Sequence, residues 1–377
     1  MLKMRGYVRK RGNKWSYTVD IGKDPITGKR KQKTKSGFDT EKEAETALNE
    51  IIYELNKGIW IAPQDIKLKD FAEDWIKMHR HKLRATTAEQ YHLKIKNWIV
   101  PLLGNYKIQD LKPIHAQKFS AQLLEKMQEN TAHKIYSITK MIMNHAVDLE
   151  IINKNPFKNI NLIKQKKGKV STWTFDDLEH FLKVTKRYSN FYYRLFATAA
   201  YTGLRKGELL ALTKDDIDFE KKFIKVCKSM YSTKEEGVQI GELKTSSSFR
   251  KVAIDDVVAS ILKEQIAKNN EMKLKLGKEY NDSKLIFCHP DGMYYHPTSL
   301  GRIMNKYIEL SGVKQIRFHD LRHTHATLLL ELGVNPKVVA DRLGHASVKI
   351  TLDTYSHVSL DLQSDVAETF SKRIKKA

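Results

Sequence analysis

The sequence has little of what secreted or membrane proteins need. It contains only two cysteines in 377 residues, Cys227 and Cys288. Two cysteines are too few for a disulfide framework and fit a reducing cytoplasm. No run of about 18 apolar residues occurs, so no membrane-spanning helix is expected. The first residues, Met1 to Arg5, lack the apolar stretch of a secretory signal.

Acidic residues are scarce relative to basic ones. The chain has 44 Asp and Glu against 67 Lys and Arg, a formal net charge of +23 at pH 7. Such an excess indicates a polyanionic partner, most commonly nucleic acid. Hydrophobic residues make up 41% and charged residues 29%, so disorder throughout is excluded. Charge alone does not separate an enzyme from a coating protein or a ribosomal protein.

The length and the composition shifts predict three domains, at residues 1–60, 61–165 and 166–377. Residues 1–60 carry 14 basic and 8 acidic residues, and residues 61–170 carry 20 and 10. The positive charge is therefore spread along the chain and does not come from one tail. A Pro-containing stretch and a basic stretch without apolar residues serve as the expected linkers.

Residues 1–60 are predicted to form a small α+β domain. Residues 15–19 alternate like a strand, and residues 29–35 alternate basic and polar side chains like a second one. Thr40 is a plausible N-cap of a helix over residues 41–57, with Glu43 at capping-box spacing. We expect the basic sheet to lie in a DNA groove, although a solvated basic surface is the alternative. The predicted DNA contacts of this domain are Arg9, Lys10, Arg11, Trp15, Tyr17, Lys29, Arg30, Lys31 and Lys33.

Residues 61–165 are predicted to be all-helical. One helix begins near Leu68, and a second covers residues 87–99 and is broken by Pro101 and Gly104. A third begins near Pro113, and a fourth covers residues 131–149. Each lysine on these helices fits a solvated surface, but the total charge favours phosphate contact. The predicted DNA contacts here are Lys94, Lys96, Lys134 and Lys140.

Six residues of the last segment form a chemically restricted set. They are Arg205 in T-G-L-R-K-G-E (202–208), Lys244 in L-K-T (243–245), His319 and Arg322 in H-D-L-R-H-T (319–324), His345 in L-G-H (343–345) and Tyr355 in D-T-Y (353–355). Two arginines can bind the non-bridging oxygens of one phosphodiester. Histidine and lysine can move protons, and a tyrosine hydroxyl can attack phosphorus. None of these steps needs a metal or a cofactor.

Each of the six residues also has an ordinary interpretation. A lone Arg or Lys is usually a surface charge, and a lone Tyr usually packs in the core. His319, His323 and His325 could suggest a metal cluster, but their spacing offers no carboxylate at the zinc-protease position. The joint order of the six residues favours chemistry on a phosphodiester.

This order resembles the tyrosine recombinase (phage integrase) family, particularly the integrases of conjugative transposons and temperate phages of low-GC Gram-positive bacteria. The resemblance covers residues 171–377 strongly and the N-terminal segment more weakly. It implies a multidomain fold: an N-terminal three-stranded sheet plus helix that binds arm-type DNA sites, an all-α SAM-like core-binding domain, and a mainly-α catalytic domain with a small antiparallel sheet.

The resemblance also implies roles. Arg205 and Arg322 would clamp the scissile phosphate, and His345 would hydrogen-bond one of its non-bridging oxygens. Glu208 would orient local structure around Arg205.

The remaining residues would carry out the covalent step. Tyr355 would be the nucleophile that forms a 3′-phosphotyrosyl link, and His319 would accept its proton. Lys244, expected on a β-hairpin, would protonate the leaving 5′-oxygen.

The implied function is site-specific recombination that integrates and excises a mobile element. The implied partners are double-stranded DNA at core and arm-type sites, further copies of the chain in a homotetramer, and also an excisionase and a host DNA-bending protein. The implied location is the bacterial cytoplasm, on the nucleoid. Two alternatives are a type IB topoisomerase, which uses similar chemistry, and a non-catalytic DNA-binding protein, which would not need the six-residue set.

Overall fold

The structure is a computed structural model of the chain. It describes residues 6–23, 27–58, 60–158, 171–243 and 249–355, without the side chains of residues 350 and 353–355. The chain divides into two compact units, Met1–Lys166 and Lys167–Ala377, and each is described by itself. Among the described residues, no helix is both long enough and apolar enough to cross a membrane.

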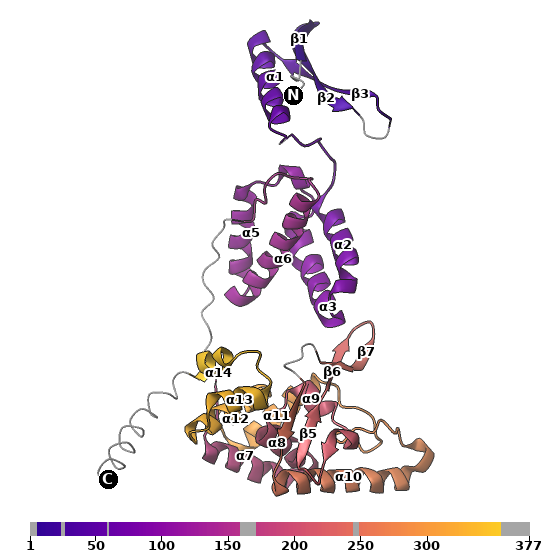
Figure 1. The fold of residues 1–377 in the computed structure, drawn as a ribbon, viewed down its shortest axis with the longest axis vertical. Helices are drawn as coiled ribbons and strands as arrows, with labels where there is room; N and C mark the ends of the chain where they lie inside the picture. The colour runs from indigo at the N-terminus through magenta and orange to yellow at the C-terminus, as the bar shows by residue number, and fades with distance from the viewer. Residues whose placement is uncertain (1–5, 24–26, 59, 159–170, 244–248, 356–377) are drawn as a thin grey trace, which may run out of the picture. The chain divides into compact units, whose positions relative to one another are not determined.

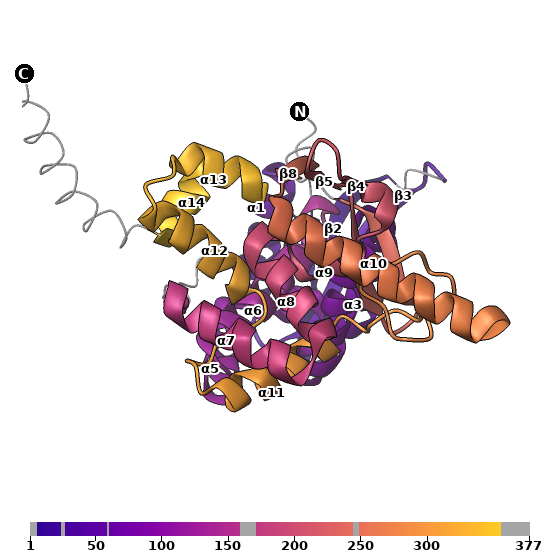
Figure 2. The same cartoon turned by 90° about the horizontal axis from the view of Figure 1, so that it is seen from below.

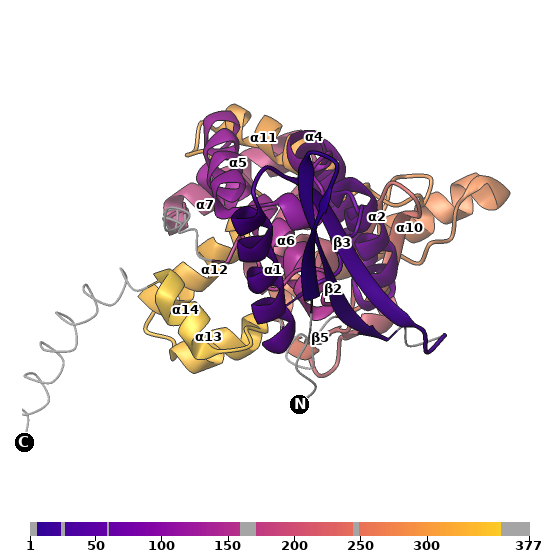
Figure 3. The ribbon, with the colours of Figure 1, turned by 90° about the horizontal axis from the view of Figure 1, so that it is seen from above.

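The first unit begins with a three-stranded antiparallel sheet (Figures 1 and 3). Its strands are β1 (Gly6–Arg11), β2 (Lys14–Lys23) and β3 (Arg30–Phe38), and β2 is the central strand. Helix α1 (Glu41–Asn56) packs on one face, with Tyr17, Val19 and Leu48 forming the core between them. The predicted capping box is present, because Thr40 accepts from the Glu43 amide and Glu43 accepts from the Thr40 amide. This cap fixes where the helix begins after β3.

The rest of the first unit is helical. Its α-helices are α2 (Leu68–His79), α3 (Ala85–Lys94), α4 (Val100–Leu103), α5 (Pro113–Lys126) and α6 (Glu129–Asp148), with short 3₁₀ turns at Arg80–Lys82 and Ile108–Asp110. Buried aromatic and aliphatic side chains from several helices, among them Phe119, Ile135 and Phe157, share one core. The Tyr136 hydroxyl donates to the Phe157 carbonyl at 3.1 Å, which ties the chain after α6 to this core.

The predicted break at Pro101 is wrong. The helical path continues from α3 through a π-helical turn, Ile95–Ile99, into α4, and it ends at Gly104. Proline removes a donor that a regular helix interior would need. Here Pro101 lies in the first turn of α4, directly after the π turn, where a missing amide N–H costs little.

The second unit is mainly helical (Figure 2). Its helices are α7 (Phe175–Tyr188), α8 (Asn190–Thr202), α9 (Lys206–Leu210), α10 (Asp256–Leu276), α11 (Ser299–Ser311), α12 (Asp320–Glu331), α13 (Pro336–Leu343) and α14 (Val348–Tyr355), with 3₁₀ turns at Lys214–Asp216 and Gly277–Glu279. Helix α8 is buried from Arg194 to Ala200 and packs against α7, α10 and α12. A capping box of Thr174 and Asp177 starts α7. Phe196 of α8 packs against Phe181 of α7, and Phe181 packs against Trp173.

Two small antiparallel sheets complete the second unit. Strands β4 (Ile217–Asp218), β5 (Phe223–Val226) and β8 (Arg250–Ala253) form one sheet, and β6 (Lys228–Thr233) and β7 (Gly237–Glu242) form a hairpin. Strand β8 also packs against α13. This packing brings the beginning of β8 close to the end of α13, where the candidate site lies.

Candidate functional site

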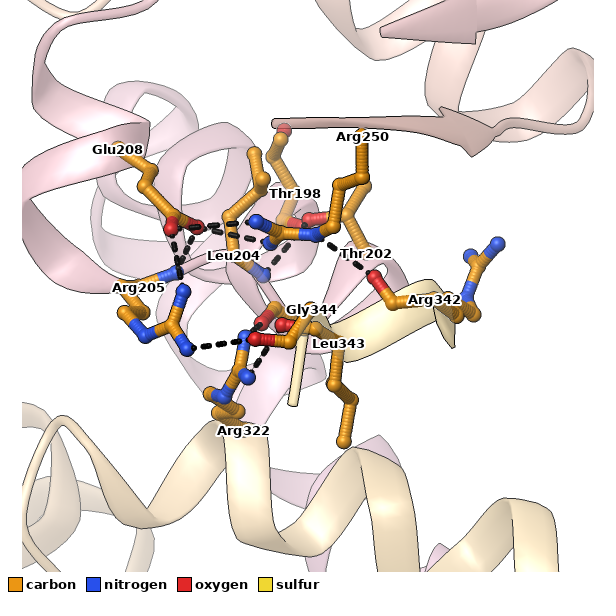
Figure 4. Close-up of polar contacts among 11 residues, drawn as sticks. Thr198, Thr202, Leu204, Arg205, Glu208, Arg250, Arg322, Arg342, Leu343 and Gly344 are labelled. Atoms are coloured by element: carbon orange, nitrogen blue, oxygen red, sulfur yellow. Dashed lines mark hydrogen bonds and ion pairs between the residues drawn. The ribbon is translucent and has the colours of Figure 1, made fainter. Parts of the chain in front are cut away.

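Arg322 joins three helices through its side chain. It lies on α12 and is buried, with 3% of its surface exposed. Its Nη1 donates to the Gly203 carbonyl at 2.9 Å, and its Nη2 donates to the Leu343 carbonyl (Figure 4). Gly203 ends α8, and Leu343 is the last residue of α13. These bonds fix the plane of the guanidinium before any substrate arrives.

Arg205 is held beside Arg322 by the next carbonyl in the chain. Gly203 adopts a left-handed conformation (φ 65°), which ends α8 and lets α9 begin with Arg205 as its N-cap. The Arg205 Nη2 donates to the Gly344 carbonyl at 3.2 Å, and its Nη1 bonds Glu208 Oε1 at 2.7 Å. About a third of the Arg205 side chain, 35%, is exposed. Two neighbouring guanidinium groups with one open to solvent suit an oxyanion such as a phosphodiester.

Glu208 is the buried acid of the site. Its side chain is 1% exposed and lies between Arg205 and Arg250, the first residue of β8. Burial opposes its charge, but hydrogen bonds and charge from Arg250 and the charge of Arg205 outweigh burial and lower the pKa of Glu208 to about 2. Glu208 is therefore a carboxylate at pH 7 that holds both arginines in place.

Two of the predicted histidines lie close to the arginines. His345 follows Gly344, and its Nδ1 lies 2.9 Å from the Thr351 hydroxyl of α14. Burial and the charges of Arg322 and Arg205 lower the pKa of His345 to about 4. His319 is the N-cap of α12. Burial and, to a smaller extent, the charges of His323 and Arg322 lower the pKa of His319 to about 4. Both imidazoles are neutral near pH 7, as a proton acceptor requires.

The structure leaves two predicted residues without described side chains. Lys244 lies outside the described residues, in the segment 244–248 between β7 and β8. Tyr355 is the last residue of α14, and its side chain is not described. Helix α14 is connected to the site through Thr351, which is fully buried and contacts His345.

Arg342 and His325 form a contact near the site that no sequence motif indicated. Arg342 Nε donates to His325 Nε2 at 3.0 Å, and its other nitrogens donate to the Ala253 and Tyr201 carbonyls at 2.9 and 3.0 Å. Burial and Arg342 lower the pKa of His325 to about 3, so this imidazole is a neutral acceptor. His325 was considered earlier only as a metal ligand. In the part of the chain that the structure describes, no three His, Cys, Asp or Glu side chains group as a metal site.

The two faces of the N-terminal sheet differ in what they carry. Strand pairing aligns Val8, Tyr17 and Lys35 in one row and Tyr7, Thr18 and Thr34 in the next. The first row faces α1, because Val8 and Tyr17 belong to its core. The opposite face, called here the open face, consists of Tyr7, Arg9, Arg11, Lys14, Ser16, Thr18, Asp20, Gln32, Thr34 and Ser36. It is polar and basic, and α1 does not cover it.

This arrangement corrects part of the predicted DNA contacts. Tyr17 is a core residue, 2% exposed, and its ring packs 5.8 Å from that of Phe38. The prediction of Tyr17 as a surface contact is therefore wrong, because a strand alternates and its odd side turns toward α1. The face toward α1 also contains Lys33, which pairs with Val19. Lys10 and Trp15, which pair across β1 and β2, lie on that face as well.

Of the other predicted contacts on β1 and β3, Arg9, Arg11 and Arg30 alternate onto the open face, whereas Lys31 alternates onto the side of Lys33. Arg9 and Arg11 are exposed on β1 and belong to the open face. Lys29 and Lys31 are exposed at the start of β3, where Arg30 forms an ion pair with Asp20.

The predicted lysines of the helical part fall on two helical segments. Lys94 ends α3 and Lys96 lies in the π turn, while Lys134 and Lys140 lie on α6. Burial and the charge of Lys134 lower the pKa of Lys94, which places these two ammonium groups near each other. Lys140 donates to the Lys158 carbonyl at 3.4 Å. A pair of close lysines is a favourable point for one phosphate.

Comparison with known protein families gives three matches along the chain. Residues 171–361 match the family described as "Phage integrase family", and residues 7–55 match "Arm DNA-binding domain". Residues 67–124 match "Phage integrase, N-terminal SAM-like domain".

Relatives and solved structures agree with these matches. A "Tyrosine recombinase XerC-like" protein of Caldanaerobacter subterraneus is 31% identical over 98% of this chain and 99% of its own length. The Tn1549 transposon integrase, solved with a circular intermediate DNA, has a TM-score of 0.70 at 22% identity and covers 81% of this chain and 99% of its own. A lambda integrase from a tetramer bound to a Holliday junction has a TM-score of 0.57 at 17% identity, covering 92% and 94%. The chain belongs to the phage integrase family, the tyrosine recombinases.

Proposed function

We propose that this chain is a site-specific DNA recombinase that integrates and excises a mobile element. The observation that carries the proposal is the pair of guanidinium groups of Arg205 and Arg322, held on the consecutive carbonyls of Gly344 and Leu343. Neutral imidazoles lie beside them, and the whole chain carries a charge of +23. A fixed pair of cationic forks stabilises the extra negative charge that builds up when a phosphodiester is attacked.

The first chemical step breaks one phosphodiester and makes another. The Tyr355 hydroxyl attacks the scissile phosphorus and gives its proton to neutral His319. The bond between phosphorus and the 5′-oxygen breaks, and Lys244 protonates that oxygen. The product is a 3′-phosphotyrosyl link and a free 5′-hydroxyl. Arg205 and Arg322 hold the two non-bridging oxygens, and His345 hydrogen-bonds one of them.

The second step reverses the first with a different strand. An incoming 5′-hydroxyl attacks the phosphotyrosyl phosphorus and gives its proton to Lys244. His319 returns its proton to the Tyr355 oxygen as that oxygen leaves. A phenolate is a better leaving group than an alkoxide because the pKa of tyrosine is about 10. The covalent link therefore conserves the bond energy, and no nucleotide hydrolysis is required.

We assign a role in recombination to each of three domains. Residues 1–60 would bind arm-type DNA sites through the open face of the sheet, and residues 61–165 would bind core DNA, with Lys94 and Lys134 contributing phosphate contacts. Residues 166–377 would carry the chemistry. The phosphate contacts would dominate affinity and make it fall with salt.

Assembly and location follow from the reaction. Exchange of two strands from each of two duplexes requires four nucleophiles, which supports a homotetramer on DNA. An excisionase and a host DNA-bending protein would select the direction. Since the substrate is chromosomal and element DNA, the protein would act in the bacterial cytoplasm on the nucleoid.

The test is covalent trapping. The full chain is mixed with a nicked suicide substrate that spans the junction of the element, and adducts are resolved by denaturing electrophoresis. We expect wild type to form an adduct, and Tyr355→Phe to bind DNA without forming one. An adduct that survives in Tyr355→Phe sinks the assignment of the nucleophile. Relaxation of any supercoiled plasmid without recombination of defined sites would indicate a topoisomerase instead.

A further inference from the structure

Arg250 connects the segments that build the candidate site. It is the first residue of β8 and lies two positions after the segment 244–248, which contains Lys244. Its side chain is 5% exposed. Its Nε donates to the Arg342 carbonyl at 2.8 Å, and Nη1 and Nη2 donate to the two oxygens of Glu208 at 3.2 and 2.8 Å. One guanidinium therefore binds both α9 and the end of α13.

These contacts close into a ring (Figure 4). Arg250 bonds Glu208, Glu208 bonds Arg205 at 2.7 Å, and Arg205 bonds the Gly344 carbonyl at 3.2 Å. The main chain from Arg342 to Gly344 completes the ring. Between those two residues, the Leu343 carbonyl accepts from Arg322. Opening the ring at Arg250 would loosen Glu208, which holds Arg205, and the Leu343 carbonyl, which is one of the two carbonyls that hold Arg322.

We propose that Arg250 is a positioning residue for cleavage, which orients Arg205 and the segment leading to His345 toward the scissile phosphate. The inference rests on the proposed function. Arg250 does not touch the substrate itself, because its guanidinium is buried and its donors point at Glu208 and the Arg342 carbonyl. A lysine cannot replace it fully, because a single ammonium cannot reach both carboxylate oxygens and the carbonyl in one plane.

The same geometry gives a pH signature. Arg205 from α9 and Arg250 from β8 are the charged groups that keep the pKa of Glu208 near 2. Without Arg250, burial raises the pKa of Glu208, so the carboxylate becomes protonated as pH falls through the new value. A protonated Glu208 no longer holds Arg205 as an ion pair. Loss of Arg250 also removes one of the cations that lower the pKa of His345, beside Arg322, Arg205 and His323.

The experiment measures the rate of adduct formation by the full chain at saturating suicide substrate, from pH 5.5 to 8.5. The DNA dissociation constant is measured separately by titration. For Arg250→Met we expect a dissociation constant within about threefold of wild type and cleavage slower by about 10²-fold, the effect of a misplacement of about 1 Å. The rate should also gain an acid limb that wild type lacks. Arg250→Lys should cleave slowly but without the acid limb, since the positive charge remains.

Two further variants separate the causes. Arg194→Met is the matched control, because Arg194 is also a buried arginine of this unit. Its Nε donates to Gln265 of α10 at 2.8 Å, and within the described part of the chain it has no bond to the ring of Arg250 and Glu208. This variant should be less stable than wild type but have the same pH profile. In the double variant Glu208→Gln with Arg250→Met, the limb that comes from Glu208 should disappear, and any limb that remains belongs to His345.

The outcomes are decisive for the inference. Arg250→Met with the wild-type rate and pH profile would overturn it, as would Arg250→Lys with the wild-type rate. If Arg250→Met does not fold, as judged by circular dichroism, Arg250→Lys alone decides between a positioning role and none. If wild type itself forms no adduct, the proposed function has failed, and the failure does not come from Arg250.

Discussion

Replacing Arg9 and Arg11 together by alanine should weaken DNA binding far more than replacing Lys33 and Lys35. All four residues are basic and lie on strands of the same sheet. Strand pairing places Arg9 and Arg11 on the open face and Lys33 and Lys35 on the side of α1. Lys33 and Lys35 also lie over aromatic rings, 5.4 Å from Trp60 and 5.5 Å from Phe38. The face of the sheet, and not its total charge, should decide binding.

The expected magnitude follows from counterion release. Each phosphate contact contributes about 0.9 to the slope of log affinity against log salt, so two lost contacts should reduce the slope by about 1.8. When salt rises fourfold, from about 50 to 200 mM, the affinity of the Arg9→Ala, Arg11→Ala variant should therefore fall by a factor roughly 12-fold smaller than the affinity of wild type. The Lys33→Ala, Lys35→Ala double variant should change the slope by less than half as much.

The assay is fluorescence anisotropy of the full chain on a random-sequence duplex at several salt concentrations. Random sequence is suitable because phosphate contacts do not depend on base identity. Circular dichroism should show that both double variants fold. Equal slopes for the two double variants, or a larger loss for Lys33 and Lys35, would refute the assignment of the open face as the DNA-binding surface.

Two further predictions concern the clamp and its histidines. Gly203→Ala should slow cleavage about tenfold or more, because a left-handed residue with a Cβ costs about 1–2 kcal/mol and the new Cβ would lie 2.7 Å from His325 and Leu343. Gly301→Ala, where a Cβ meets nothing within 4 Å, is the control, and equal rates in a trapping assay would contradict the prediction. The wild-type cleavage rate should change little from pH 8 to 6 and fall toward pH 4, because His319 and His345 have lowered pKa values and act as neutral groups. A pH–rate profile with an acid limb centred near 6.5 would contradict this assignment.

Local signals predicted local structure well. The capping box of Thr40 with Glu43 lies within four residues of sequence, and the helix begins where those residues indicate. The strand pattern of residues 15–19 was recognised for the same reason. Pro101 was misread because its effect depends on the π turn that precedes it, and a π turn has no clear sequence signal.

Contacts between distant residues could be predicted only where a motif linked them. The order of motifs selected Arg205, Arg322 and His345, and the structure places them together; their catalytic roles stay predictions. The Arg250–Glu208 bond joins residues 42 positions apart, and no periodicity connects them. The prediction for Tyr17 was wrong for a related reason. Alternation shows that a strand has two faces, but only the packing of α1 determines which face is buried.

Besides the Glu208 carboxylate on Arg205, the acceptors that hold the two arginines of the clamp are backbone carbonyl oxygens of Gly203, Leu343 and Gly344. Every residue type supplies such an oxygen, so amino-acid exchange at these positions cannot delete the acceptor. A substitution can only move the carbonyl oxygen. The largest shift is expected at Gly203 and Gly344, whose φ values of 65° and 66° suit few other residues. A library that randomises residues 343 and 344 should therefore recover almost exclusively glycine at position 344, and at the fully buried position 343 it should recover apolar residues that keep the core filled.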